Sequence, residues 1–313
     1  MRALKLGEHM KDIVVVGGGP AGLTAAVYGV RNGKSVLVIE KSTFGGQINN
    51  SPKVENIPGF ESISGDDFGE RFLEQAMNQG AEVSFAEVTG VSREGDTFLV
   101  ETDLGEKIEA RTVILATGTT HRVLGLPGEE DLIGNGISFC AVCDGDFYRD
   151  GTVVMIGGGN SAFVEAALLV EIVGKLVMLQ DMPFFTADAK SQEQVFSHGN
   201  VETHVGCKIL GYVTEGGKLT GVRYEEGGIE KTAMCDGVFL AVGLVPENDA
   251  FAGLADLNRW GYFDSGEDCH TKTPGLFVAG DARSKTLRQV TTACADGAQA
   301  AIEACNYIRN ELS

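Results

Sequence analysis

Two glycine-rich turns of the same design constrain the fold of this 313-residue chain more than any other feature. The first, GGGPAG at 17–22, follows an apolar run at 12–16 and opens a helical pattern that reaches Arg31. The second, GGGNSA at 157–162, follows an apolar run at 153–156 and opens a helical pattern over 163–173. Such a turn between a strand and a helix lets the backbone approach a pyrophosphate at the helix N-terminus. The repeat therefore predicts an α/β fold of two Rossmann-like, doubly wound, three-layer nucleotide-binding domains.

The first turn is followed by the acid that completes a dinucleotide-binding unit. The next apolar run, 36–39, ends on Glu40. A carboxylate at that strand end is placed to accept hydrogen bonds from a ribose 2′-hydroxyl. The full strand–turn–helix–strand context makes the first match specific.

The chain predicts a discontinuous first domain. A turn-rich stretch at 119–135 marks a boundary, and beyond Pro246 the composition returns to that of the first unit. There, 275–281 reads as a strand that ends in Asp281, and 290–306 reads as a long helix. We expect one domain from 10–118 and 246–313, with 119–245 inserted into it. Residues 1–9 do not fit the strand that follows, so we exclude them and expect the native start at Met10.

Short alternating segments predict an antiparallel addition to each unit. In the first unit they are 81–88, 97–102 and 107–110, with a separate buried strand at 111–115 and a helix at 65–79. In the second they are 201–206, 208–214, 219–225 and 229–234, followed by a buried strand at 238–242.

A CxxC pair, Cys140 and Cys143, lies just before the second glycine-rich turn and is followed at once by Asp144. Two thiols at this spacing can form a small disulfide ring that exchanges electrons with another disulfide or with a flavin. A structural zinc site needs four ligands, and the other five cysteines are scattered singly, so we predict no metal. A packed structural pair is the remaining alternative for the cysteines, and Asp144 could serve as a helix cap.

Composition excludes several classes of function. Lys and Arg total 25 against 44 Asp and Glu, which gives a net charge of −19 and argues against nucleic-acid binding. No run approaches the roughly 18 apolar residues of a membrane span, and no signal peptide is evident. We expect a cytoplasmic protein with no membrane role and with free thiols apart from a working redox pair.

The order of motifs from Ile13 onward resembles the low-molecular-weight thioredoxin reductase family. The motifs are GGGPAGL, GGQI, NIPG, ATG, CAVCDG, GGGNSA, VGLVP, GLFVAGDA and RQVTTA. The CAVCDG element is the most specific of them. The resemblance implies a homodimeric FAD enzyme that reduces thioredoxin. It also implies a rotation of the second domain that exposes a dithiol otherwise buried against the flavin.

The resemblance also implies a role for individual residues. Cys143 would lie nearest the flavin, Cys140 would attack the substrate disulfide and Asp144 would shuttle the proton. Gln47 and Asn56 would lie along the flavin, Asp281 would bind the ribitol chain, and Gln289 would sit at the pyrimidine end of the ring. The full implied FAD set is Gly17, Gly19, Pro20, Ala21, Gly22, Glu40, Gly46, Gln47, Asn56, Ala116, Thr117, Gly118, Gly280, Asp281, Arg288, Gln289 and Val290.

The chain departs from the family at the second nucleotide site. NADPH-using members have a His-Arg-Arg run after the strand that follows GxGxxA, whereas this chain reads Leu179-Gln180-Asp181-Met182-Pro183. No Lys or Arg occurs in 180–189. Each lost arginine contact to a 2′-phosphate forfeits roughly 1.5–3 kcal/mol, and Asp181 adds repulsion. NADPH is therefore not the expected donor.

Three electron routes remain open from the sequence. Asp181 could serve as the ribose acid of an NADH site, although Phe184 and Phe185 would crowd an adenine. The second route is a donor protein, as in the ferredoxin-linked flavin thioredoxin reductases, with a deazaflavin as a variant. The net charge opposes an acidic ferredoxin, but a patch of Arg283, Lys285 and Arg288 could override it. In the third route electrons run the other way, as in FAD-dependent dithiol oxidases, which oxidise a small dithiol and pass its electrons to oxygen.

Overall fold

The computed structural model describes residues 10–51 and 54–312 and divides the chain into two units. The first consists of the described parts of 1–49, 63–120 and 245–313, so the N-terminal and C-terminal parts of the chain build it together. The second consists of 121–244 with the described part of 50–62. The grouping of 50–62 with the second unit differs from the predicted division. The expectation about residues 1–9 lies outside the described residues.

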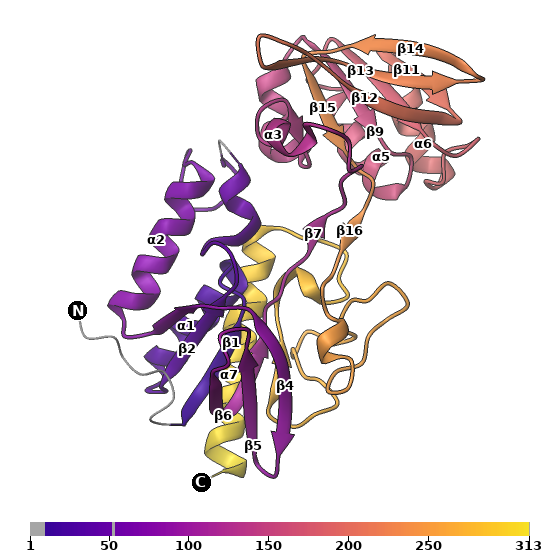
Figure 1. The fold of residues 1–313 in the computed structure, drawn as a ribbon. Helices are drawn as coiled ribbons and strands as arrows, with labels where there is room; N and C mark the ends of the chain where they lie inside the picture. Colours follow the sequence, from indigo (N-terminus) through magenta and orange to yellow (C-terminus); the bar gives the residue numbers. More distant parts are fainter. Residues whose placement is uncertain (1–9, 52–53, 313) are drawn as a thin grey trace. The chain divides into compact units, whose positions relative to one another are not determined.

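A parallel sheet forms the centre of the first unit (Figure 1). Its parallel strands, in spatial order, are β3 (Glu82–Phe85), β2 (Val36–Glu40), β1 (Lys11–Val16), β6 (Lys107–Leu115) and β17 (Leu276–Val278). The helices are α1 (Pro20–Arg31), α2 (Gly65–Asn78) and α7 (Val290–Glu311), with short 3₁₀ turns at Gly46–Asn50 (η1), Asp249–Phe251 (η3) and Gly280–Ala282 (η4). The sheet is buried on both faces, which explains the uninterrupted apolar runs of β1 and β2.

The antiparallel addition to this sheet consists of β4 (Val88–Glu94), β5 (Thr97–Thr102) and the first half of β6. The predicted meander was wrong in two places. Segment 81–88 contributes β3, which pairs in parallel with β2, and 107–115 forms one strand instead of two. Burial alternates along β6 up to Arg111 and is continuous from Thr112, because the strand leaves β5 and enters the buried parallel sheet between β1 and β17.

Helix α7 packs closely against α1, which joins the two ends of the chain in one layer (Figure 1). Gly297 makes this approach: a Cβ there would lie 2.1 Å from the carbonyl oxygen of Ala21. Small buried residues of α7, Ala300, Ala301 and Ala304, continue the contact surface. The long small-residue helix predicted at 290–306 is thus present and extends to Glu311.

A buried ion cluster ties α7 to the loop after β17. Asp296 accepts hydrogen bonds from Nε and Nη2 of Arg283 at 3.1 and 2.9 Å and from Nζ of Lys285 at 2.9 Å. It also accepts the Gly280 N–H at 3.0 Å. The side chain of Arg283 is 2% exposed, that of Lys285 is 9% exposed and that of Asp296 is 8% exposed. Of the basic patch suggested at Arg283, Lys285 and Arg288, the first two cannot contribute, because their side chains are buried and paired, whereas Arg288 is half-buried.

The second unit contains another parallel sheet in the order β11 (Val201–Val205), β10 (Lys175–Gln180), β9 (Thr152–Ile156), β15 (Gly237–Leu240) and β8 (Ile137–Ser138). The helices are α3 (Glu129–Leu132), α4 (Ala141–Asp144), α5 (Asn160–Leu169) and α6 (Ala189–Phe196), with a 3₁₀ turn at Gly145–Tyr148 (η2). The antiparallel strands are β12 (Cys207–Glu215), β13 (Lys218–Glu226) and β14 (Ile229–Met234). Segment 201–206 was predicted to be antiparallel, but β11 pairs in parallel with β10. The two sheets confirm the predicted α/β class.

Two short strands, β7 (Thr120–His121) and β16 (Leu244–Val245), pair with each other where the chain passes between the units. Within residues 10–51 and 54–312, no helix combines the length and apolar character needed to cross a bilayer.

Replacing Asp296 with Asn should destabilise the first unit. Arg283 and Lys285 would lose their buried counter-charge, and Arg283 would retain the fully exposed Glu267 at 3.6 Å. We therefore expect the free energy of unfolding to fall by about 3–5 kcal/mol. Urea unfolding at pH 7 measures this loss. Burial alone would raise the pKa of Asp296, but the bonds from Arg283 and Lys285 outweigh burial and lower it. This stabilisation is therefore complete above the ordinary pKa of Asp and is lost as the pH falls through the lowered folded value.

Glu101→Gln is the control, because Glu101 pairs with exposed Lys107 at 2.8 Å. It should leave the unfolding midpoint nearly unchanged. Equal losses in the two variants would contradict the structural role assigned to Asp296.

Candidate active site

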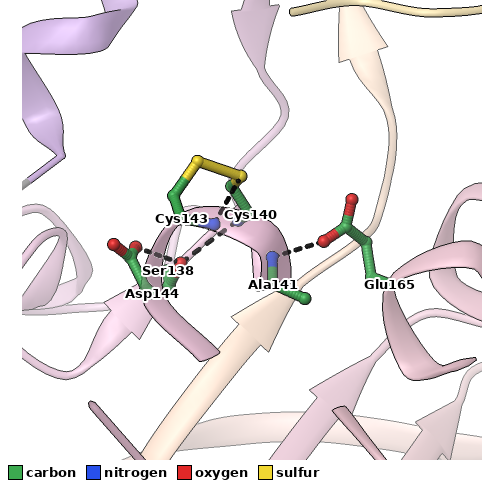
Figure 2. Close-up of a disulfide and its surroundings, with 6 residues drawn as sticks. All are labelled: Ser138, Cys140, Ala141, Cys143, Asp144 and Glu165. Atoms are coloured by element: carbon green, nitrogen blue, oxygen red, sulfur yellow. Dashed lines mark hydrogen bonds between the residues drawn. A yellow bond between two sulfur atoms is a disulfide. The ribbon is translucent and has the colours of Figure 1, made fainter. Parts of the chain in front are cut away.

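The two central cysteines form a disulfide in the second unit (Figure 2). Cys140 precedes α4 in an extended conformation and Cys143 lies within this one-turn helix, which brings their Cα atoms to 5.3 Å. The Cys143 N–H donates to Cys140 Sγ at 3.2 Å. Both cysteines are partly exposed, and the other five, all in the described part of the chain, are unpaired. The structure thus joins the two thiols that the sequence singled out.

Asp144 ends the same helical turn and points toward Ser138 on β8 (Figure 2). The Ser138 hydroxyl donates to Asp144 Oδ2 at 2.5 Å, and the Cys140 N–H donates to the same hydroxyl oxygen at 3.1 Å. Burial raises the pKa of Asp144, and the bond from Ser138 works against that rise. Oδ1 is buried and has no hydrogen-bond partner among the described residues. The side chain caps no helix that the structure describes, so the helix-cap alternative is not observed.

A second carboxylate touches the disulfide turn, and the sequence interpretation missed it. Glu165 on α5 accepts the N–H of Ala141, the first residue of α4 (Figure 2). Burial raises the pKa of Glu165, and this hydrogen bond opposes the rise. A polar residue in the otherwise apolar helix NSAFVEAALL was the available signal, but only the fold shows that it reaches the cysteines.

The first glycine-rich turn approaches the end of β6. A Cβ at Gly17, whose φ is +105°, would lie 2.2 Å from the carbonyl oxygen of Ala116. Glu40 ends β2, and its Oε2 accepts the Gly18 N–H at 2.7 Å. Gly46 lies against this turn as well, with its Cβ position 3.1 Å from the Cα of Gly19. The predicted residues of β1, β2, β6 and η1 therefore meet at one edge of the sheet.

The C-terminal residues predicted for the same site lie beside this turn. Gly280 has a φ of +75°, and a Cβ there would lie 2.8 Å from the Cβ of Ala21. Asp281 follows; burial raises its pKa, although Lys285 and Arg288 lower it in part. Its Oδ1 is buried and unpartnered within the part of the chain that the structure describes. Arg288 donates to the carbonyl oxygen of Asp281 at 3.2 Å.

These features fit the FAD that the resemblance implies. A glycine-rich turn at the N-terminus of α1 suits a pyrophosphate, and an unpartnered buried carboxylate suits a hydroxyl-bearing chain. Gln289 lies at the N-cap of α7 with a capping box to Thr292, and Val290 begins that helix. Asn56 belongs to the stretch 50–62 that groups with the second unit.

The second glycine-rich turn repeats the first with one change at the strand end. A Cβ at Gly157, with φ +127°, would lie 2.4 Å from the carbonyl oxygen of Ala241. The Gly157 N–H donates to Leu179, as the Gly17 N–H donates to Ile39. Gln180 is therefore the counterpart of Glu40, and the exposed Asp181 lies one residue beyond. Asp181, the residue that could serve as the ribose acid of an NADH site, thus lies one residue beyond the position that corresponds to Glu40.

The aromatic residues after this strand do not distinguish the two turns. A Cβ at Gly158 would lie 2.7 Å from the Phe185 ring, and a Cβ at Gly18 would lie 2.5 Å from the Phe44 ring. Phe185 packs inward against Phe163 with ring centroids 5.3 Å apart. The distinguishing features are the neutral Gln180 and the lack of cations in 180–189.

Comparison with known proteins matches residues 11–297 to the pyridine nucleotide-disulphide oxidoreductase family. The chain belongs to this family. Thioredoxin reductases of Listeria monocytogenes and Bacillus subtilis are 38% and 36% identical over 303 residues, which cover 96% of this chain and 95% and 96% of theirs. The crystal structure of thioredoxin reductase from Streptococcus pyogenes is 35% identical, with a TM-score of 0.88, and the match covers 96% of this chain and 98% of that one. The identification of the low-molecular-weight thioredoxin reductase family is confirmed, and with it a disulfide oxidoreductase.

Asp144→Asn should stabilise the second unit at alkaline pH. Because its folded pKa is raised, the carboxylate form is penalised in the native state. The loss of stability begins as the pH rises above the ordinary pKa of Asp and is complete above the raised folded value. We expect the variant to gain up to about 1–3 kcal/mol over wild type at pH 8 and nothing below the ordinary pKa of Asp. Urea unfolding from pH 4 to pH 8 measures the difference.

Asp146→Asn is the matched control, because Asp146 lies two residues away with a side chain that is 60% exposed. It should show no comparable pH dependence. An Asp144→Asn variant less stable than wild type at pH 8 would refute the raised pKa.

Proposed function

We propose that this protein is an FAD-dependent thioredoxin reductase that passes electrons from a donor to FAD, then to Cys140 and Cys143, and then to thioredoxin. The observation that carries this proposal is a partly exposed disulfide followed directly by a buried carboxyl with a raised pKa. The family membership and the relatives named thioredoxin reductase support it. As the resemblance implies, the protein would act as a homodimer in the cytoplasm.

Reduction of the Cys140–Cys143 disulfide takes up two electrons and two protons. The residues of the first unit would hold FAD, which, once reduced by the donor, would supply the two electrons. Asp144 supplies a proton to the thiolate that leaves the disulfide, since burial raises the pKa of its carboxyl and so favours the protonated form. The Ser138 hydroxyl holds Oδ2, which leaves Oδ1 available for the transfer.

The reduced pair then transfers its electrons by thiol–disulfide exchange. Cys140 attacks the thioredoxin disulfide and forms a mixed disulfide while one thioredoxin thiolate leaves. Cys143 attacks Cys140 Sγ, restores the Cys140–Cys143 disulfide and releases reduced thioredoxin. The partial exposure of both sulfurs is compatible with this exchange.

The FAD site proposed for the first unit uses the glycine turn, Glu40 and the Gly280–Asp281 loop. The Asp296 cluster positions that loop, because Asp296 binds the Gly280 N–H and Arg283 at once. The remaining predicted contacts from the first unit, including Gln47, Thr117, Gly118 and Gln289, belong to the same proposal.

The proposed donor is not NADPH. The strand end that should hold a ribose and a 2′-phosphate presents Gln180 and exposed Asp181, with no cation through residue 189. We propose a ferredoxin-type protein as donor. NADH is the alternative, because an NADH site needs no cation for a 2′-phosphate; Gln180 itself is buried, and its amide donates to the Phe184 carbonyl oxygen at 3.4 Å. Arg283 and Lys285 are buried, so they cannot steer a donor protein.

Cys143→Ser should abolish thioredoxin reduction, with a loss of at least about 10³-fold, because no disulfide can form at the turn. Insulin precipitation coupled to thioredoxin, with dithionite-reduced enzyme, measures turnover independently of the natural donor. Cys207→Ala, which changes an unpaired cysteine of β12, is the control and should retain activity. Activity in Cys143→Ser, or reduced wild-type enzyme inactive toward every thioredoxin tested, would exclude the proposed relay.

Anaerobic addition of NADPH, NADH and reduced ferredoxin, each alone, should bleach the flavin fastest with ferredoxin and slowest with NADPH.

The double variant Asp181→Arg, Met182→Arg restores two cations after the strand and should speed bleaching by NADPH at least tenfold. Asp146→Arg is the charge control. Rapid bleaching of wild type by micromolar NADPH would overturn the donor assignment, and rapid peroxide formation from dithiols in air would favour the dithiol oxidase instead.

A further inference from the structure

We infer that Glu165 is a positioning residue that sets the reduction equilibrium of the Cys140–Cys143 pair by holding the backbone N–H at the start of the CxxC turn. This inference rests on the proposed redox role of that pair. It adds a second carboxyl to the site, on the other side of the turn from Asp144 (Figure 2).

The backbone around the turn provides few hydrogen-bond donors, and most of them have partners. The Cys140 N–H goes to Ser138 Oγ at 3.1 Å, and the Cys143 N–H goes to Cys140 Sγ at 3.2 Å. The Asp144 N–H goes to the Cys140 carbonyl oxygen at 3.0 Å. Glu165 takes the N–H of Ala141, the residue that directly follows Cys140. The Glu165 carboxylate therefore accepts the hydrogen bond of the Ala141 N–H, and this N–H is then not available to stabilise a Cys140 thiolate.

This placement has a defined electrostatic consequence. Helix N-terminal donors lower the pKa of an adjacent cysteine, and a nearby negative charge raises it. Glu165 therefore disfavours thiolate formation at the turn. A less stable thiolate makes the reduced pair a stronger reductant, which suits an enzyme that must deliver electrons to another disulfide.

The other ionisable groups around the turn do not explain such an effect above pH 6. Burial is the main reason that the pKa of Tyr148 rises to about 12. Burial also lowers the pKa of His121 to about 4. His121 stacks on Phe139, directly before Cys140, and is neutral in this range. Asp146 pairs with Arg149, and both are exposed. On α6, which packs against α5, Lys190 and Glu193 are exposed to solvent. Among the described residues, buried Asp144 is the other acid hydrogen-bonded within the turn, whereas Glu165 is half-buried.

The equilibrium with glutathione tests the inference directly. The protein dithiol and oxidised glutathione give the protein disulfide and two reduced glutathione molecules, so atoms and electrons balance. The holoenzyme is equilibrated at set glutathione ratios from pH 6 to pH 8.5, and the thiols are alkylated. Mass spectrometry of the peptide that contains Cys140 and Cys143 then gives the reduced fraction. This readout needs neither the donor nor thioredoxin, so it stays valid if the proposed function fails.

Glu165→Gln keeps a hydrogen-bond acceptor and removes the charge. We expect its equilibrium to shift toward the dithiol by about fivefold at pH 8.5, which corresponds to a potential about 20 mV less negative. The shift should be under about 1.5-fold at pH 6, where few thiolates exist. Glu165→Asp retains the charge and should stay closer to wild type than Glu165→Gln, and Asp146→Asn should match wild type.

Coincident curves for wild type and Glu165→Gln at every pH would overturn the inference, as would equal shifts in Glu165→Gln and Glu165→Asp. The wild-type protein alone offers a second test if the variants do not fold. The pH dependence of iodoacetamide alkylation of reduced Cys140 should give a pKa near or above the ordinary value of about 8.5. A Cys140 pKa below about 7 would contradict the role assigned to Glu165.

Discussion

The close approach of a glycine backbone to a neighbouring strand end organises both units of this protein. Gly17 would place a Cβ 2.2 Å from the Ala116 oxygen, and Gly157 would place one 2.4 Å from the Ala241 oxygen. Any side chain at either position would force the turn away from the sheet. The helix that follows each turn could then no longer start at the carboxyl edge, where its N–H groups face the predicted nucleotide site.

The disulfide turn depends on buried carboxyls rather than on basic groups. Asp144 and Glu165 both have raised pKa values because burial penalises their charged forms. Asp144 is held by Ser138 and retains an unpartnered oxygen, whereas Glu165 is bound to the backbone beside Cys140. The two acids are thus suited to different tasks, proton transfer for the first and control of thiolate stability for the second.

Charge in the first unit serves the architecture of the proposed flavin site. In a chain with a net charge of −19, Arg283 and Lys285 lie inside the protein and neutralise Asp296. Because Asp296 also binds Gly280, the cluster fixes the loop that carries Asp281. Arg283 and Lys285 therefore stabilise the fold of this unit and are not available at its surface for a partner.

The sequence by itself determined the two Rossmann-like units and the discontinuous first unit, and it singled out the two cysteines that form the disulfide. Glycines at fixed spacing, apolar runs and a CxxC followed by an acid are local signals, and each has few physical solutions. Only the tertiary structure decided which strands pair, since β3 and β11 look like the antiparallel segments beside them but join parallel sheets. It also decided that Gln180 rather than Asp181 is the counterpart of Glu40, because register depends on hydrogen bonds to a distant strand. The burial of Arg283 and the reach of Glu165 to the disulfide turn are likewise long-range contacts, and no local pattern of residues encodes them.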